Sequence, residues 1–139
     1  MTKQKFHSEL IQSGEWQSEL ELAAKRILET LGQSPDLTCV FLSPHFQNEA
    51  ESIVSQIDAA LGSINTIGCT GESIVGMRVE VESSPAISIW TAVLPDTSVI
   101  PMRLEFERKP DGGVITGWPD EALASWGEEA ALLLLGEPF

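Results

Sequence analysis

TIGCTGESIVG, residues 66–76, is the stretch from which the fold of this chain can be worked out. An apolar run from Ile64 to Cys69 gives way to small and polar residues, with three glycines in nine positions. Glycine lets the backbone turn through positive φ and approach other groups closely. The pattern therefore predicts a strand that empties into a loop, at the sheet edge where open α/β sheets bind ligands.

The sequence before this stretch predicts a βαβ unit. Residues 38–42 (TCVFL) form a continuous apolar and β-branched run, which is typical of a strand covered on both faces. Apolar residues then recur at helical spacing from Phe46 to Leu61, and Gly62 ends that segment. Strands joined in this way are parallel, with a right-handed crossover. The glycine loop should therefore lie at the carboxyl end of the second strand.

The N-terminal part predicts one more helix. Residues 16–31 have apolar positions at helical spacing, and Gly32 is a plausible stop. Residues 1–14 carry few apolar anchors, and we expect a loosely ordered arm there.

After Gly76 the apolar period falls to two. Residues 78–82, 86–93 and 102–107 are separated by turn residues, which predicts an antiparallel meander with Trp90 in the core. Residues 119–126 predict a short helix, and residues 130–135 (AALLLL) predict a buried strand.

The fold class expected is mixed α+β, within the broad α/β group. One βαβ unit is followed by an antiparallel meander, and helices pack on a mixed sheet. Residues 1–139 are expected to form a single domain, because this length suits one hydrophobic core. The abrupt end after the run 130–135 predicts truncation of a longer protein at the C-terminus.

Charge narrows the possible partners. Lysine and arginine number 8 against 21 acidic residues, which gives a net charge of −13. Such a charge repels phosphate backbones and anionic lipid, so we expect neither a nucleic-acid nor a membrane partner. No signal peptide is visible at the start, and the expected location is the cytoplasm with Cys39 and Cys69 reduced.

The candidate site is the segment Cys69, Thr70, Gly71, Glu72 and Ser73. Its backbone N–H groups would face a carboxylate, and Glu72 would suit an ammonium group rather than a phosphate. The glycine spacing matches neither a Walker loop nor a dinucleotide fingerprint. We expect no cofactor and no metal, since the cysteines and histidines lack ligand spacing.

Catalysis by a thiol is the alternative chemistry. Cys69 could be a nucleophile and His45, which follows the first predicted core strand, could be its base. The plainer interpretation makes Cys69 a small shielded hydrophobe of low reactivity and His45 an ordinary loop residue. Glu72 could equally be a solvated loop acid.

Three segments resemble the N-terminal part of the FIST domain. They are residues 67–72 (IGCTGE), 85–90 (PAISIW) and 132–139 (LLLLGEPF), in order and at sensible spacing. The resemblance covers about residue 36 onward and implies a sensory domain of signal-transduction proteins, with small molecules such as amino acids as ligands. It also implies a partner, the C-terminal half of the same parent protein. The family offers no catalytic residues to transfer, and only the loop 68–72 is expected to face a ligand.

The leading hypothesis is thus a non-catalytic domain that senses a small polar ligand through residues 69–73. A thiol enzyme using Cys69 with His45 and a protein-interaction module that docks through a sheet edge remain as alternatives.

Overall fold

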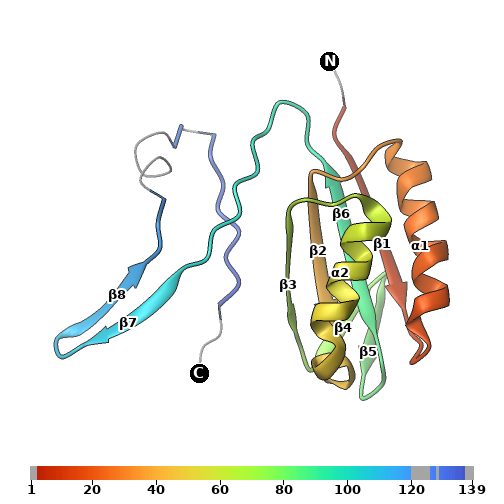
Figure 1. Cartoon of the computed structure of the whole chain (residues 1–139), viewed down its shortest axis with the longest axis horizontal. Helices are drawn as coiled ribbons and strands as arrows, with labels where there is room; N and C mark the ends of the chain where they lie inside the picture. Colours follow the sequence, from red (N-terminus) through yellow and green to blue (C-terminus); the bar gives the residue numbers. More distant parts are fainter. Residues whose placement is uncertain (1–2, 120–125, 128, 137–139) are drawn as a thin grey trace. The chain divides into compact units, whose positions relative to one another are not determined.

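The computed structural model describes residues 3–119, 126, 127 and 129–136. The chain divides into two compact units, residues 1–99 and residues 100–139. The first unit holds a four-stranded sheet, two α-helices and a hairpin, and the second holds another hairpin (Figure 1).

The central sheet confirms the predicted βαβ unit. Its strand order is β1 (Lys5–Ile11), β6 (Ile87–Val93), β2 (Leu37–Leu42) and β3 (Thr66–Thr70). Only β2 and β3 run parallel; β6 is antiparallel to both of its neighbours. A 3-10 helix (Pro44–Glu49) and α2 (Ala50–Leu61) connect the parallel pair. The mixed α+β class is confirmed.

One face of this sheet is covered by α1 (Trp16–Leu31) and α2 (Figure 1). Each helix ends at a glycine in the left-handed conformation, as predicted for Gly32 and Gly62. The core between the helices and the sheet consists mainly of aliphatic side chains, packed around the indole ring of Trp16. Its largest fully buried members include Trp16, Ile11, Ile27, Leu31, Ile53, Ile57, Leu61, Ile87, Ile89 and Val40.

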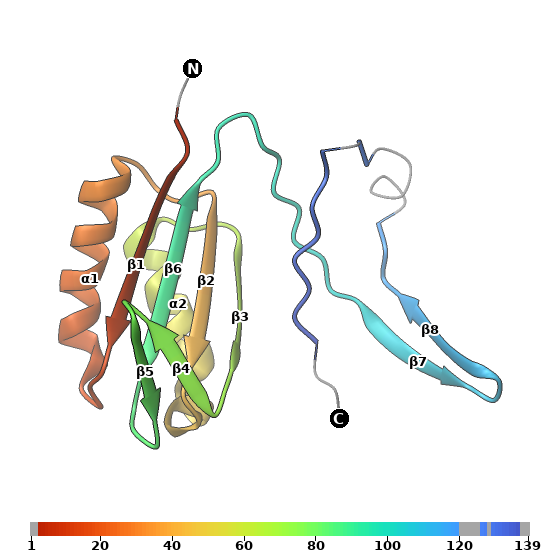
Figure 2. The ribbon, with the colours of Figure 1, turned by 180° about the vertical axis from the view of Figure 1, so that it is seen from behind.

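The opposite face of the sheet is covered at one end only, by the hairpin of β4 (Ser73–Gly76) and β5 (Val79–Glu82) (Figure 2). Ile74 and Val81 of the hairpin are buried with Ala86, against Leu10 and Phe41 of the sheet. The candidate loop joins β3 to this hairpin and therefore links the sheet to its second layer.

The expectation of a loosely ordered N-terminal arm is wrong. Residues 5–11 form β1, an edge strand paired in full with β6. The sequence did not indicate this strand because three of the side chains that face the helices are polar: Lys5, His7 and Glu9. Their polar groups find partners on β1 and α1, so the strand does not show the apolar alternation of a half-buried strand.

The predicted meander is also wrong, although its first two runs are strands. β5 pairs with β4, whereas β6 enters the central sheet between β1 and β2. The hairpin turn has Met77 and Arg78 at positive φ, 48° and 66°. Turns of that kind usually carry Asn or Gly, so this sequence gave no sign of one.

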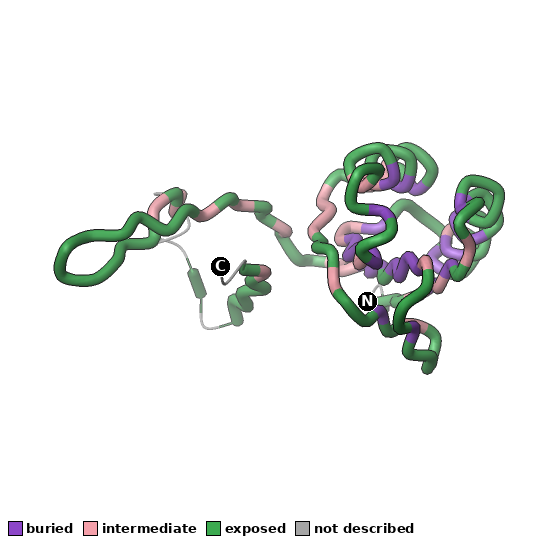
Figure 3. Tube along the Cα trace, turned by 90° about the horizontal axis from the view of Figure 1, so that it is seen from below, coloured by how far each residue is buried: buried purple, intermediate pink, exposed green. Residues whose placement is uncertain are grey.

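In the second unit, β7 (Glu105–Lys109) pairs with β8 (Gly112–Thr116). No described residue of this unit is buried (Figure 3). The predicted buried strand at 130–135 is wrong here, because these residues are irregular and mostly exposed. The helix predicted at 119–126 falls mainly on residues 120–125, outside the described residues. Trp118 and Trp126 meet edge to face at 5.9 Å.

Candidate functional site

The candidate segment begins within β3 rather than after it. Cys69 and Thr70 are the last two residues of the strand, and both are exposed. Successive side chains of a strand point to opposite faces, so the structure separates these two residues. Cys69 lies on the face that carries the β4–β5 hairpin and Thr70 on the helix side. The prediction that Cys69 is shielded is wrong, because β3 is an edge strand.

Two of the three glycines serve packing. A Cβ on Gly68 would overlap the carbonyl oxygen of Val40 on the paired strand. A Cβ on Gly76 would lie 2.9 Å from Ser88 Oγ and 3.2 Å from Leu10, because the hairpin crosses close over the sheet. Only Gly71 has ordinary space around it. Gly68 and Gly76 are thus explained by the close approach of neighbouring strands within the fold. Only Gly71 is not explained by packing and can serve the loop.

The loop itself is partly engaged in internal hydrogen bonds. The Gly71 N–H donates to the carbonyl oxygen of Leu42 at 3.0 Å. The Ser73 hydroxyl donates to Glu80 Oε1 at 2.9 Å, and Glu72 is exposed. Glu80 was missed as a site residue, although the alternation of residues 78–82 already placed Glu80 and Glu82 on an outer face. This part of the first unit therefore presents exposed carboxylates and a hydroxyl.

The two residues of the thiol hypothesis, His45 and Cys69, have different surroundings. His45 Nδ1 lies 3.3 Å from Ser43 Oγ, and Ser43 Oγ also accepts the Ala86 N–H at 3.0 Å. Among the hydrogen bonds of the described residues, none links His45 to Cys69. Cys39 is buried, and desolvation raises the pKa of its thiol, which disfavours the reactive thiolate. Both thiols are free.

Two open hollows lie elsewhere, between α1 and α2. One of about 570 Å³ is lined by Glu21, Ala24, Lys25, Leu28, Glu29 and Ala60, and one of about 360 Å³ adjoins it near Gln17 and Gln56. Neither is lined by residues 69–73, so a cleft at the loop stays a prediction. Within the described residues, no cluster of three or more His, Cys, Asp or Glu side chains is placed to hold a metal ion. No helix among them is long and apolar enough to cross a membrane.

Trp90 is not in the core, contrary to the prediction. Its side chain is on the face opposite the helices, 36% exposed, with the ring stacked on Phe6 at 5.7 Å. Strand register places no charged residue anywhere on this face of the four-stranded sheet. We call it the uncharged face; it comprises Phe6, Ser8, Leu10, Ser88, Trp90, Ala92, Leu37, Cys39, Phe41, Ile67 and Cys69.

The architecture defines a small α+β domain whose exposed polar loop follows the carboxyl end of a parallel strand pair. The FIST N domain family matches residues 36–138, most of the chain. This chain belongs to that family, which is a family of sensory domains of signal-transduction proteins. The resemblance found in the sequence is thereby confirmed.

The curated relatives are longer proteins. An uncharacterised protein of Mycobacterium tuberculosis is 31% identical over 119 residues, which are 86% of this chain and 30% of that protein. An uncharacterised protein of Mycobacterium bovis is 28% identical over 123 residues, 88% of this chain and 30% of that protein. The chain thus spans about a third of the length of the curated relatives it matches. No solved structure matches.

Proposed function

We propose that this chain is the ligand-binding part of a non-catalytic sensor and that residues 69–73 contact a small polar ligand, such as a free amino acid. The observation that carries the proposal is the position of Thr70, Gly71 and Glu72, which are exposed or half-exposed at the carboxyl end of β3 in a domain of a sensory family. Ligands of open α/β sheets bind at that end.

The charges favour an ammonium group on the ligand. Glu72 is exposed, and Glu80 is held near the loop by the Ser73 hydroxyl. Carboxylates bind ammonium groups through charge-assisted hydrogen bonds. The Gly71 N–H already donates to Leu42, so the carboxylate of an amino acid needs other donors than this one. The Thr70 hydroxyl is the nearest candidate in sequence.

The experiment is a thermal-shift screen of amino acids, because a ligand that binds only the folded state raises its melting temperature. Glu72→Gln should weaken binding of any hit by about 1.5–3 kcal/mol, the typical value for a hydrogen bond to a charged group. Glu29→Gln is the matched control, since Glu29 is an exposed acid on α1 with only a 3.9 Å contact to Lys25. Equal binding by the Glu72→Gln variant and the parent would remove residue 72 from the site.

A second function is favoured by the uncharged face. A Trp and a Phe stacked on an exposed sheet face are typical of protein interfaces, where aromatic side chains are enriched. We propose that in longer family members this face packs against polypeptide beyond the matched part, such as a C-terminal half. Maleimide labelling of Cys69, which lies on this face, should then be slower in the longer protein than in the 139-residue chain.

A further inference from the structure

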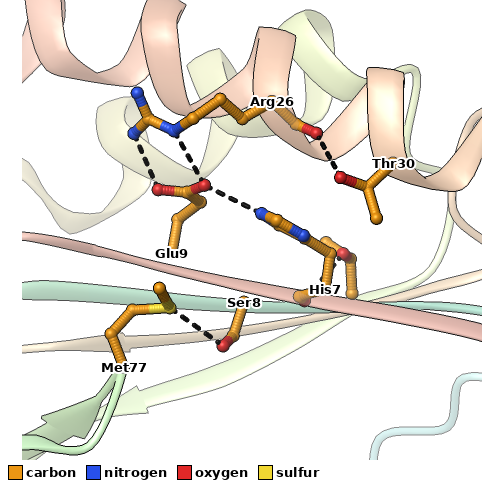
Figure 4. Close-up of polar contacts among 7 residues, drawn as sticks. His7, Ser8, Glu9, Arg26, Thr30 and Met77 are labelled. Carbon is orange, nitrogen blue, oxygen red and sulfur yellow. Dashed lines mark hydrogen bonds and ion pairs between the residues drawn. The ribbon is translucent and has the colours of Figure 1, made fainter.

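An ionic cluster links the edge strand β1 to α1. None of its residues belongs to the proposed ligand site at residues 69–73. Glu9 is the only buried carboxylate among the described residues, at 6% exposure. Its neighbours in the cluster are His7, two residues earlier on β1, and Arg26 on α1 (Figure 4).

Both oxygens of Glu9 are bound. Arg26 Nε donates to Oε1 at 2.9 Å and Arg26 Nη2 donates to Oε2 at 2.7 Å, which is a two-pronged contact. His7 Nε2 lies 2.8 Å from Oε1. Such paired contacts between guanidinium and carboxylate are the strong form of a charged hydrogen bond. A carboxyl buried beside a helix in this way depends on its partners to offset the loss of hydration.

Other contacts also hold β1: it pairs with β6 from Lys5 to Ile11, Ile11 is buried in the helix-side core, and Leu10 packs beneath the hairpin. Lys5 Nζ donates to the carbonyl oxygen of Leu31 at the end of α1, at 2.6 Å. The Thr91 hydroxyl of β6 donates to the His7 carbonyl oxygen at 3.0 Å. β1 has only one sheet neighbour, β6, because it lies at the edge. An edge strand can therefore come loose without breaking the contacts between β6, β2 and β3.

We propose that His7, Glu9 and Arg26 form an acid-released latch: protonation of the Glu9 carboxylate frees β1 from α1 and opens the edge of β6 while the rest of the unit stays folded. The step is the transfer of one proton from solvent to Glu9, which removes the charge that Arg26 binds. The groups that face Glu9 are Arg26 from α1 and His7 from its own strand, with Glu19 close enough to act on Arg26. The β6 residues on that side, Ile87, Ile89, Thr91 and Val93, do not ionise in the acidic range.

The direction of the pH dependence follows from the contacts. Hydrogen bonds from Arg26 hold the pKa of Glu9 below its ordinary value, against the opposing effect of burial, and the contact with His7 acts in the same direction as Arg26. A carboxylate whose folded-state pKa is lowered stabilises the fold fully above its unfolded pKa. That stabilisation is lost as the pH falls through the folded-state pKa. The latch is therefore closed at neutral pH and opens in acid.

Hydrogen exchange of backbone amides tests the latch, with protection factors measured from neutral pH down to about pH 3, below the ordinary pKa of a glutamate. In the parent, the amides of β1 that bond to β6 should lose protection about tenfold or more in acid, the change expected from losing a charged hydrogen bond. The amides of β2 and α2 should keep their protection. In Glu9→Gln, β1 should be less protected already at neutral pH, with little further change in acid.

Two milder variants keep the test decisive if Glu9→Gln does not fold. His7→Gln leaves the Arg26 contact in place but removes one cause of the lowered pKa, so opening should move to higher pH. Arg26→Lys keeps the charge without the two-pronged geometry, so it should loosen β1 at neutral pH and differ little from the parent in acid, where the latch is already open. Glu29→Gln, an exposed acid on the same helix, should match the parent. The proposal is overturned if β1 and β2 lose protection together in the parent, or if these variants leave β1 unchanged.

Discussion

The two faces of the four-stranded sheet differ in what covers them. On one face, α1 and α2 enclose a continuous aliphatic core, with Trp16 only 1% exposed. On the other, the β4–β5 hairpin covers one end, and Phe6, Trp90 and Cys69 remain exposed. Folding is thus stabilised mainly from the helix side. The uncharged face and the loop beside it are the surfaces for which we propose binding, since exposed aromatic patches commonly mark interaction sites.

The largest loss of stability should come from a change on the face of the sheet that the helices cover. Trp16→Ala removes a fully buried indole from the contact between α1 and the sheet, and truncation of a buried aromatic costs about 3–5 kcal/mol. Urea denaturation of parent and variant measures this difference. A loss below about 1 kcal/mol would mean that the helix side is not the principal core.

A smaller loss of stability is expected from a change between the parallel strands β2 and β3. Gly68→Ala would bring a Cβ into the carbonyl oxygen of Val40, so β3 must shift away from β2. Overpacking of this kind costs about 1–3 kcal/mol. Gly71→Ala, at a position with ordinary space, is the control and should change the free energy of unfolding much less. Equal effects of the two changes would contradict the assignment of Gly68 to packing.

Trp90→Ala should cost less than Trp16→Ala. The Trp90 ring is partly exposed, and its stacking on Phe6 contributes about 0.5–1.5 kcal/mol beyond the area that the ring buries. The comparison with Trp16→Ala uses the same residue type on the two faces of one sheet. A cost of 3 kcal/mol or more for Trp90→Ala, in the range of core truncations, would show that this face is covered in solution.

Labelling of the two thiols tests the difference in exposure within the sheet without a mutation that changes stability. Cys69 is exposed at the sheet edge, and Cys39 is buried with a raised pKa. A maleimide should therefore label Cys69 readily in the folded chain and Cys39 only after denaturation. Mass spectrometry of peptides identifies the labelled thiol, and the variant Cys69→Ser should take up no label while folded.

The sequence predicted those elements whose signal is local. Gly32 and Gly62 end their helices, and residues 38–42 form the central parallel strand as their apolar run indicated. The elements that were predicted wrongly depend on residues distant in the sequence. β1 was missed because Glu9 looks like a surface acid until Arg26, 17 residues away, is placed against it. The pairing of β4 with β5 was missed because Met77 and Arg78 carry no turn signature.

The candidate loop was predicted in position but not in detail. The place of residues 69–73 after the parallel strand follows from the βαβ pattern alone. That Gly68 and Gly76 serve packing, and that Glu80 joins Ser73, depends on how the hairpin folds back over the sheet. Alternation along one strand cannot give that information.

The central claim, that this sensory domain binds its ligand at residues 69–73, is tested most directly by a nuclear magnetic resonance titration. Amide resonances of the labelled chain are followed while an amino acid found in the thermal-shift screen is added. The account predicts that the resonances of Thr70, Gly71, Glu72 and Ser73 move first and furthest, and that Glu72→Gln reduces the shifts. Shifts gathered instead around Ala24, Leu28 and Ala60, in the hollow between α1 and α2, would contradict it.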